Sequence, residues 1–155
     1  MTTLTTDHPA PAAPAHSSAP APTPEERSHL LHPPLRTDAD IEERVMSAIG
    51  TACRTQLWLL LLDAHDRQLP IALPCDDLAP KPRRGDADTL VAFMAGLMAD
   101  RGATQLIAVW ERPGGGALGG ADAAWATALA EACDRRGVRL RAQLHSHSRG
   151  VTLLP

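Results

Sequence analysis

The sequence has few aromatic residues, and this scarcity limits the partners it can bind. Its 155 residues include no tyrosine, one phenylalanine (Phe93) and three tryptophans. Proteins that hold single-stranded nucleic acid stack its bases on aromatic side chains. The basic loop Lys81-Pro82-Arg83-Arg84 is too short for a nucleic-acid footprint, and the net charge of −3 favours no polyanion. We therefore expect no nucleic-acid partner.

Long apolar runs and paired cysteines are also missing. No apolar run approaches the roughly 20 residues of a membrane-spanning helix, and the N-terminus lacks the basic start and apolar core of a secretory signal. Cys53, Cys75 and Cys133 are far apart, odd in number and without C-x-x-C spacing, which is typical of reduced thiols. These absences predict a soluble, cytoplasmic protein with no membrane partner.

Proline is abundant but unevenly distributed. Eight of the 14 prolines fall in residues 1–36, a stretch built mainly of Ala, Pro, Thr, His and Ser. Such a composition cannot bury enough apolar surface to offset the entropy of ordering the chain. We predict a disordered Pro/Ala-rich tail over residues 1–36 and one folded domain over residues 37–155, which is a usual single-domain size.

Short apolar runs predict the strands of this domain. Residues 57–62 are uninterruptedly apolar and end in turn-like residues, a pattern typical of a strand buried on both faces. Residues 106–110 repeat that pattern, whereas residues 138–145 alternate and should have one wet face. Residues 69–73 also alternate, but the flanking and internal prolines predict an edge strand in a hairpin with residues 57–62.

Helical spacing of apolar residues separates these strands. Thr37 with Asp40 three residues later predicts a capped helix start, and the helix should run to about Cys53. Two further helices should end at Gly102 and Gly137, and a short last strand should cover residues 151–154. Helices interleaved with strands predict an α/β fold, with helices packed on a mixed β-sheet of about five strands.

A glycine-rich loop at residues 114–119 satisfies the pattern G-x-G-x-x-G between a predicted strand and a predicted helix. That is the context of a dinucleotide fingerprint, because amides at a helix start can hold a pyrophosphate. However, Glu111-Arg112-Pro113 separates the strand from the first glycine, and no acid is placed to bind a ribose. The sequence therefore favours a plain connecting loop and predicts no cofactor.

His145-Ser146-His147 raises the question of a metal site. Two histidines at i and i+2 on a strand share a face, and neutral imidazole suits zinc. The segment resembles the metal-binding pair of JAMM-type metalloproteases, but those proteins need a downstream acid and none follows Asp134 here. We predict two strand-end histidines with no metal, and a zinc titration would test this interpretation.

The polar side of the last long predicted strand is the candidate ligand or partner surface. Alternation would place its side chains on one face, and an arginine-histidine strip can take a phosphate or an acidic partner. A plain solvated sheet face is the simpler interpretation. The residues of this polar strip are Arg139, Arg141, Gln143, His145 and His147.

No acid, base, nucleophile and ligand set converges at a recognisable spacing, so we assign no catalytic residue. The favoured hypothesis is a small non-catalytic cytosolic domain that acts through protein–protein interaction, with a protein partner or as a homo-oligomer through its edge strands. The alternative is a small-molecule, metal-dependent or nucleic-acid-acting enzyme. Its site would lie at the C-terminal strand ends, near Asp63, Glu111 and His145, where ligands usually sit in α/β sheets.

Five segments of the domain form a recognisable set: Gln56-Leu57-Trp58, Gln68-Leu69-Pro70, Asp76-Asp77-Leu78, Asp122-Ala123-Ala124-Trp125-Ala126 and Gly137-Val138-Arg139-Leu140-Arg141. They resemble landmarks of a family of short α/β proteins from high-GC actinobacteria. The resemblance would cover about residues 37–154. That family has no established activity, so the resemblance implies the fold and no catalytic residue or cofactor.

Overall fold

The computed structural model describes residues 20, 21, 23 and 32–155. Most of the predicted tail, residues 1–36, therefore lies outside the described residues. Its last part belongs to the domain: Leu35 is only 3% exposed, and its N–H donates to the carbonyl of Asp66 at 2.7 Å. The folded unit thus begins a few residues before Thr37.

Five strands form one mixed sheet in the order β2-β1-β3-β4-β5. β3 and β4 run parallel, whereas every other neighbouring pair is antiparallel. This confirms the predicted hairpin and the predicted mixed sheet of about five strands, with β2 at one edge and the short β5 at the other. The strands are β1 (Gln56–Leu62), β2 (Gln68–Cys75), β3 (Gln105–Glu111), β4 (Arg139–His147) and β5 (Gly150–Leu153).

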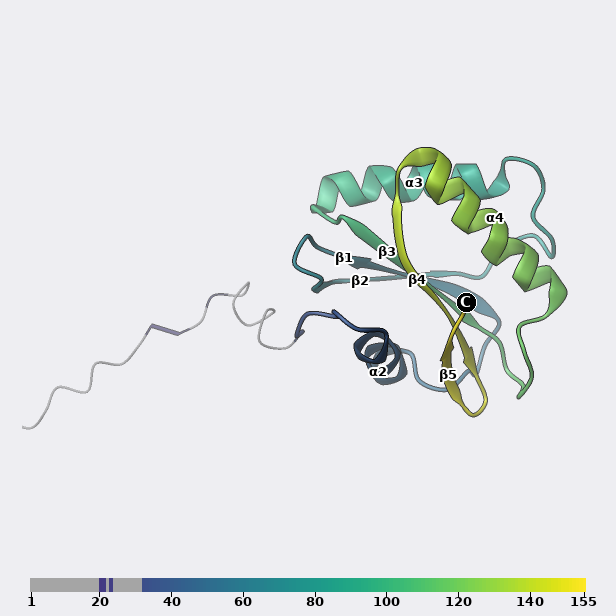
Figure 1. Ribbon diagram of the computed structural model, residues 1–155, viewed down its shortest axis with the longest axis horizontal. Coiled ribbons are helices and arrows are strands. Elements are labelled where there is room, and N and C mark those ends of the chain that lie inside the picture. The colour runs from purple at the N-terminus through teal and green to yellow at the C-terminus, as the bar shows by residue number, and fades with distance from the viewer. Residues whose placement is uncertain (1–19, 22, 24–31) are drawn as a thin grey trace, which may run out of the picture.

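Helices cover both faces of the sheet (Figure 1). α3 (Asp86–Arg101) and α4 (Gly120–Arg136) lie on one face, and α2 (Asp38–Ala48) lies on the other. Alternate leucines of β1 point to opposite sides, since Leu57, Leu59 and Leu61 pack under α3 and α4 while the even-numbered leucines pack toward α2. The apolar hexad at residues 57–62 is therefore a strand buried between two helix layers, as predicted.

The helix ends follow the local sequence. Thr37 Oγ1 accepts the N–H of Asp40 at 3.1 Å, and Asp40 Oδ2 accepts the N–H of Thr37 at 2.8 Å, which completes the predicted capping box. α3 and α4 end at glycines in the left-handed region, again as predicted. α2 ends at Ala48, earlier than the expected Cys53, because the chain turns at Gly50 with φ +79°.

The thiols and the helices agree with two expectations from composition. Cys53, Cys75 and Cys133 are free, and only Cys133 is fully buried. Across residues 32–155 no helix combines the length and the apolar character that a membrane span requires.

Candidate functional site

Of the three residues at which the alternative enzyme hypothesis placed a site, the structure puts only two at the same end of the sheet. In the parallel pair β3–β4, His145 lies opposite Trp110 and Ser146 lies opposite Glu111, so His145 and Glu111 share one end of the sheet. β1 runs antiparallel to β3, and its C-terminal end therefore meets the start of β3. Asp63 follows that end of β1 and therefore lies at the opposite end of the sheet from Glu111 and His145. The expected trio does not converge.

Asp63 serves the turn between β1 and β2. Its Oδ1 accepts the N–H groups of His65 at 2.8 Å and Arg67 at 2.9 Å. Asp66, with φ +60°, closes the same turn and accepts a hydrogen bond from Gln105 Nε2 at 2.7 Å. The Asp63 carboxylate thus acts in local backbone bonding, its usual role in turns, whereas that of Asp66 ties the turn to the start of β3.

Glu111 is the most highly hydrogen-bonded carboxylate of the described chain, and it is only 2% exposed. Oε1 accepts the N–H groups of Cys53 at 2.9 Å and Arg54 at 3.1 Å, while Oε2 accepts Gln56 Nε2 at 2.7 Å and Trp58 Nε1 at 2.8 Å. Burial raises the pKa of Glu111, but these four hydrogen bonds outweigh it and lower the pKa to about 2. The carboxylate ties residues 53–58 to the end of β3. Because both of its oxygens accept internal hydrogen bonds, it is not available as a general base or as a metal ligand.

The polar strip predicted on β4 is divided between the two faces. The register between β3 and β4 shifts between Leu106/Leu140 and Ile107/Ala142, so β4 carries a bulge there. Arg141 consequently reaches the α2 side and donates to Asp38 Oδ1 at 3.1 Å. Gln143 lies on the α4 side. This corrects the expectation that Arg139, Arg141, Gln143, His145 and His147 project together.

Gln143 has a structural position within that strip. Its Oε1 accepts Trp110 Nε1 at 3.0 Å, and its Nε2 donates to the carbonyl of Ala126 at 2.9 Å. The side chain therefore joins β3 to α4 and satisfies the buried indole. Its amide is not free to bind a ligand.

The two histidines of β4 differ in their surroundings, although their ring centroids lie 5.2 Å apart. His147 Nδ1 accepts the N–H of Arg149 at 3.3 Å, so Nε2 carries the ring proton and donates to Thr152 Oγ1 at 3.0 Å. His145 is 6% exposed and has no hydrogen-bond partner among the described residues. Burial, followed by the charges of His147 and Arg112, lowers the pKa of His145.

The histidine pair lacks the further ligands of a metal centre. Within the part of the chain that the structure describes, no group of three or more His, Cys, Asp or Glu side chains is placed to hold a metal ion. Structural zinc takes four protein ligands and catalytic zinc three. The pair is better suited to hydrogen bonding than to zinc.

The glycine-rich loop is held in place beside the histidines. Gly114 makes two hydrogen bonds with Ser148. The N–H of Gly114 donates to Ser148 Oγ at 2.8 Å, and the carbonyl of Gly114 accepts the N–H of Ser148 at 2.9 Å. Arg149 Nη2 donates to the carbonyl of Gly115 at 2.5 Å. Gly114 has φ +119°, a conformation that requires glycine. The loop is thus pinned to the turn between β4 and β5.

Arg112 anchors the other side of the loop. Its Nε and Nη2 donate to the two carboxylate oxygens of Asp122 at 2.9 and 2.6 Å, and its Nη1 donates to the carbonyls of Gln56 and Glu111. A bidentate pair of this kind fixes the start of α4 relative to β3. Sequence reasoning missed this pair, because neither residue belongs to a recognisable motif.

Two hollows adjoin His145. The first, about 270 Å³, is called the histidine hollow and lies between the glycine-rich loop, His145 and the start of α4. The second, about 430 Å³, is called the terminal hollow and shares His145, Gly116 and Ala117 with the first. It is lined in addition by Gly115, Leu118, His147, Arg149, Thr152, Leu153, Leu154 and Pro155.

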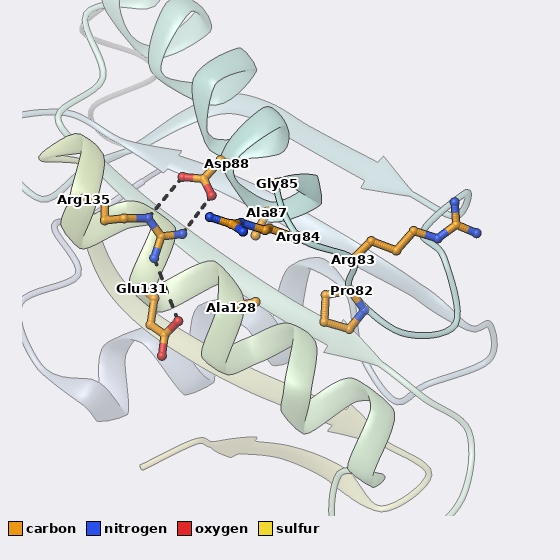
Figure 2. A pocket seen from close by; sticks show the side chains of 9 residues that line it. All are labelled: Pro82, Arg83, Arg84, Gly85, Ala87, Asp88, Ala128, Glu131 and Arg135. Carbon is orange, nitrogen blue, oxygen red and sulfur yellow. Dashed lines mark hydrogen bonds and ion pairs between the residues drawn. The ribbon is translucent and has the colours of Figure 1, made fainter.

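A third hollow, about 560 Å³, lies on the outer side of the helix layer, between the start of α3 and the outer side of α4. We call it the arginine hollow, and Figure 2 shows its lining. Asp88 pairs with Arg135 at 2.8 Å, while Arg84 points toward that pair and Arg83 points away from it. The basic loop at residues 81–84 was visible in the sequence, but its position over a hollow was not. The lining residues are Pro82, Arg83, Arg84, Gly85, Ala87, Asp88, Ala128, Glu131 and Arg135.

Comparison of the chain with models of known protein families finds no match, and neither does comparison with curated proteins. The geometry of the hollows is therefore the basis for any functional proposal.

Proposed function

We propose that the protein is a non-catalytic binding domain whose arginine hollow takes an acidic segment of a partner protein. The observation that carries the proposal is the state of Arg83 and Arg84, whose guanidinium groups make no ion pair or hydrogen bond within residues 32–155 although they line a hollow of about 560 Å³. Unpaired arginines over a hollow are suited to charge-assisted hydrogen bonds with carboxylates.

The local charge of the hollow supports an acidic occupant. Three arginines line it against two acids, Asp88 and Glu131. Both acids already face Arg135, and a hydrogen bond from Arg135 keeps the pKa of Asp88 below its usual value. The lining therefore has a net charge of +1, and Arg83 and Arg84 are its arginines without an acidic partner in the described part of the chain, whose full sequence has a net charge of −3. Such a local contrast steers an acidic segment to this one surface.

The sheet edges offer a poorer route to association than we expected from the sequence. In the edge strand β2, Pro74 lies opposite Trp58 of β1, and Pro70 lies in the irregular stretch between Gln68 and Ala72. Two positions of this edge therefore lack an N–H. At the other edge the N–H of Leu153 in β5 donates to Glu42 Oε1 at 3.1 Å. Blocked edges of this kind discourage strand addition. A partner at the helix layer is favoured over a homo-oligomer formed through the strands.

The enzyme alternative receives less support. Glu111 and Asp63 use their carboxylates in internal hydrogen bonds, at opposite ends of the sheet. The proposal includes a cytoplasmic location, which the three free cysteines favour because disulfides are common in exported proteins.

A peptide titration tests the proposal. The probe is a fluorescent peptide of alternating Glu and Ser, titrated with the full chain at low salt and read by anisotropy. Exposed ion pairs contribute about 0.2–1 kcal/mol each, so Arg83→Ala/Arg84→Ala should weaken binding about tenfold. The control variant Arg54→Ala/Arg101→Ala removes the same charge from two other exposed arginines and should change the affinity less than about twofold.

Two results would contradict the proposal. Equal weakening in both double variants would mean that the peptide responds only to net charge. Tighter binding of a single-stranded oligonucleotide than of the peptide would mean that the partner of the hollow is a nucleic acid and not a protein.

A further inference from the structure

His145 is a buried residue, 6% exposed, whose ring has no hydrogen-bond partner among the described residues. It lines both hollows. The fully buried side-chain atoms without a partner in residues 32–155 are Arg67 Nε and Gln105 Oε1, so the ring nitrogens of His145 keep contact with solvent through the hollows. The ring therefore has hydrogen-bonding capacity for a ligand in the hollow.

The start of α4 adds a free donor to the histidine hollow. Gly119 is the N-cap, with φ −64° and ψ 160°, and it has no side chain that could accept a hydrogen bond. The first amide to be bonded is that of Ala123, which donates to the carbonyl of Gly119 at 2.8 Å. The three preceding N–H groups therefore have no acceptor among the described residues, and the residue among them that lines the hollow is Asp122. Amides at the start of a 17-residue helix attract anions.

The charges around the histidine hollow permit an anion. The carboxylate of Asp122 would repel one, but Arg112 neutralises it through two hydrogen bonds. Arg149 adds a positive charge at the terminal hollow and has no carboxylate partner in residues 32–155. Burial lowers the pKa of His145, and a neutral imidazole still donates one hydrogen bond.

We propose that the amide of Asp122 and the ring of His145 bind the phosphate group of a small phosphate monoester in the histidine hollow, at the positive end of α4. The organic part of the ester lies in the terminal hollow against Leu118 and Leu154, next to Arg149. This site is independent of the arginine hollow, which lies on the outer side of the helix layer. It also gives the G-x-G-x-x-G loop a function as the wall of a phosphate site.

The first test uses the full chain with inorganic phosphate, phenyl phosphate and phenol as probes, followed by amide chemical shifts. Phosphate should move the signals of Gly120, Ala121 and Asp122. Phenyl phosphate should bind more tightly than inorganic phosphate because its ring enters the terminal hollow, and phenol should not bind. Unmoved signals at the start of α4 would overturn the proposal, and so would equal affinities for phenol and phenyl phosphate.

A pair of histidine variants tests the role of the imidazole. His145→Leu removes the ring nitrogens and should weaken phenyl phosphate binding at least about tenfold, since the charged phosphate group loses a hydrogen-bond donor. His65→Leu makes the same change in the turn between β1 and β2, at the opposite end of the sheet, and should leave the affinity unchanged. The melting temperature of His145→Leu should not fall, because no internal hydrogen bond is lost. Unchanged affinity in a folded His145→Leu protein would overturn the proposal.

Discussion

Glu111 and His145 are buried polar residues at the same end of the sheet, one on each face, and they differ in one property. Glu111 accepts four hydrogen bonds from residues 53–58, whereas His145 has none among the described residues. A satisfied buried group stabilises the fold, and an unsatisfied one leaves hydrogen-bonding capacity for a ligand. The contrast separates a structural carboxylate from a binding imidazole within two adjacent strands.

The largest expected effect on stability comes from a substitution that disrupts the hydrogen bonds of Glu111. Glu111→Gln keeps the shape but replaces one oxygen by an NH₂ group, which faces donors instead of accepting from them. Because two buried donors lose their acceptor, the free energy of unfolding should fall by about 3 kcal/mol. Urea unfolding measures the change, and the exposed Glu43→Gln on α2 should be nearly neutral. A loss below about 0.5 kcal/mol would mean that Glu111 does not hold residues 53–58 in place.

The pH dependence of stability examines the same carboxylate in the native sequence. The pKa of Glu111 is about 2 in the folded chain, against 4.5 as its reference value. A lowered folded pKa stabilises the protein above pH 4.5, and the contribution is lost as the pH falls from about 5 toward 2. The shift corresponds to about 3 kcal/mol. Urea unfolding at several pH values should show this loss in the native chain and a much smaller one in Glu111→Gln.

The two residues also show how far the sequence could predict the fold. The strand at residues 57–62, the capping box at Thr37 and the glycine helix ends are encoded within a few neighbouring residues, and all of these were predicted correctly. The donors to Glu111 lie more than 50 positions away in the chain, and no local pattern reveals them. Only the register of β1 and β3 brings them together.

The β4 bulge shows why the candidate surface was less predictable. Strict alternation places Arg141 and His145 on one face, but a shift of one residue moves a side chain to the other. The bulge between Leu140 and Ala142 does this. Residues after it, including His145 and His147, keep their common face. The sequence therefore predicted the common face of the histidine pair, while Arg141 turned toward α2.

A smaller effect compares the starts of α2 and α4. Thr37 accepts the N–H of Asp40 at 3.1 Å, so Thr37→Ala should lower the free energy of unfolding by about 1 kcal/mol. Thr51→Ala, an exposed threonine outside the helices, is the matched control and should change it by less than about 0.5 kcal/mol. Equal effects in urea unfolding would contradict a stabilising role for the cap.

The smallest expected effect adds a cap where α4 has none. Gly119→Ser supplies a hydroxyl that can accept an amide of the first turn, and a Cβ there meets no atom within 4 Å. The free energy of unfolding should rise by a few tenths of a kcal/mol. Phosphate binding should weaken at the same time, because the new hydroxyl occupies a donor that the anion needs. Gly96→Ser, at an exposed position of α3 that lines neither hollow, is the control and should leave the phosphate affinity unchanged. Because capping and anion binding compete for the same N–H groups, a gain in stability without a loss of phosphate affinity would mean that the amides of α4 are not part of the site.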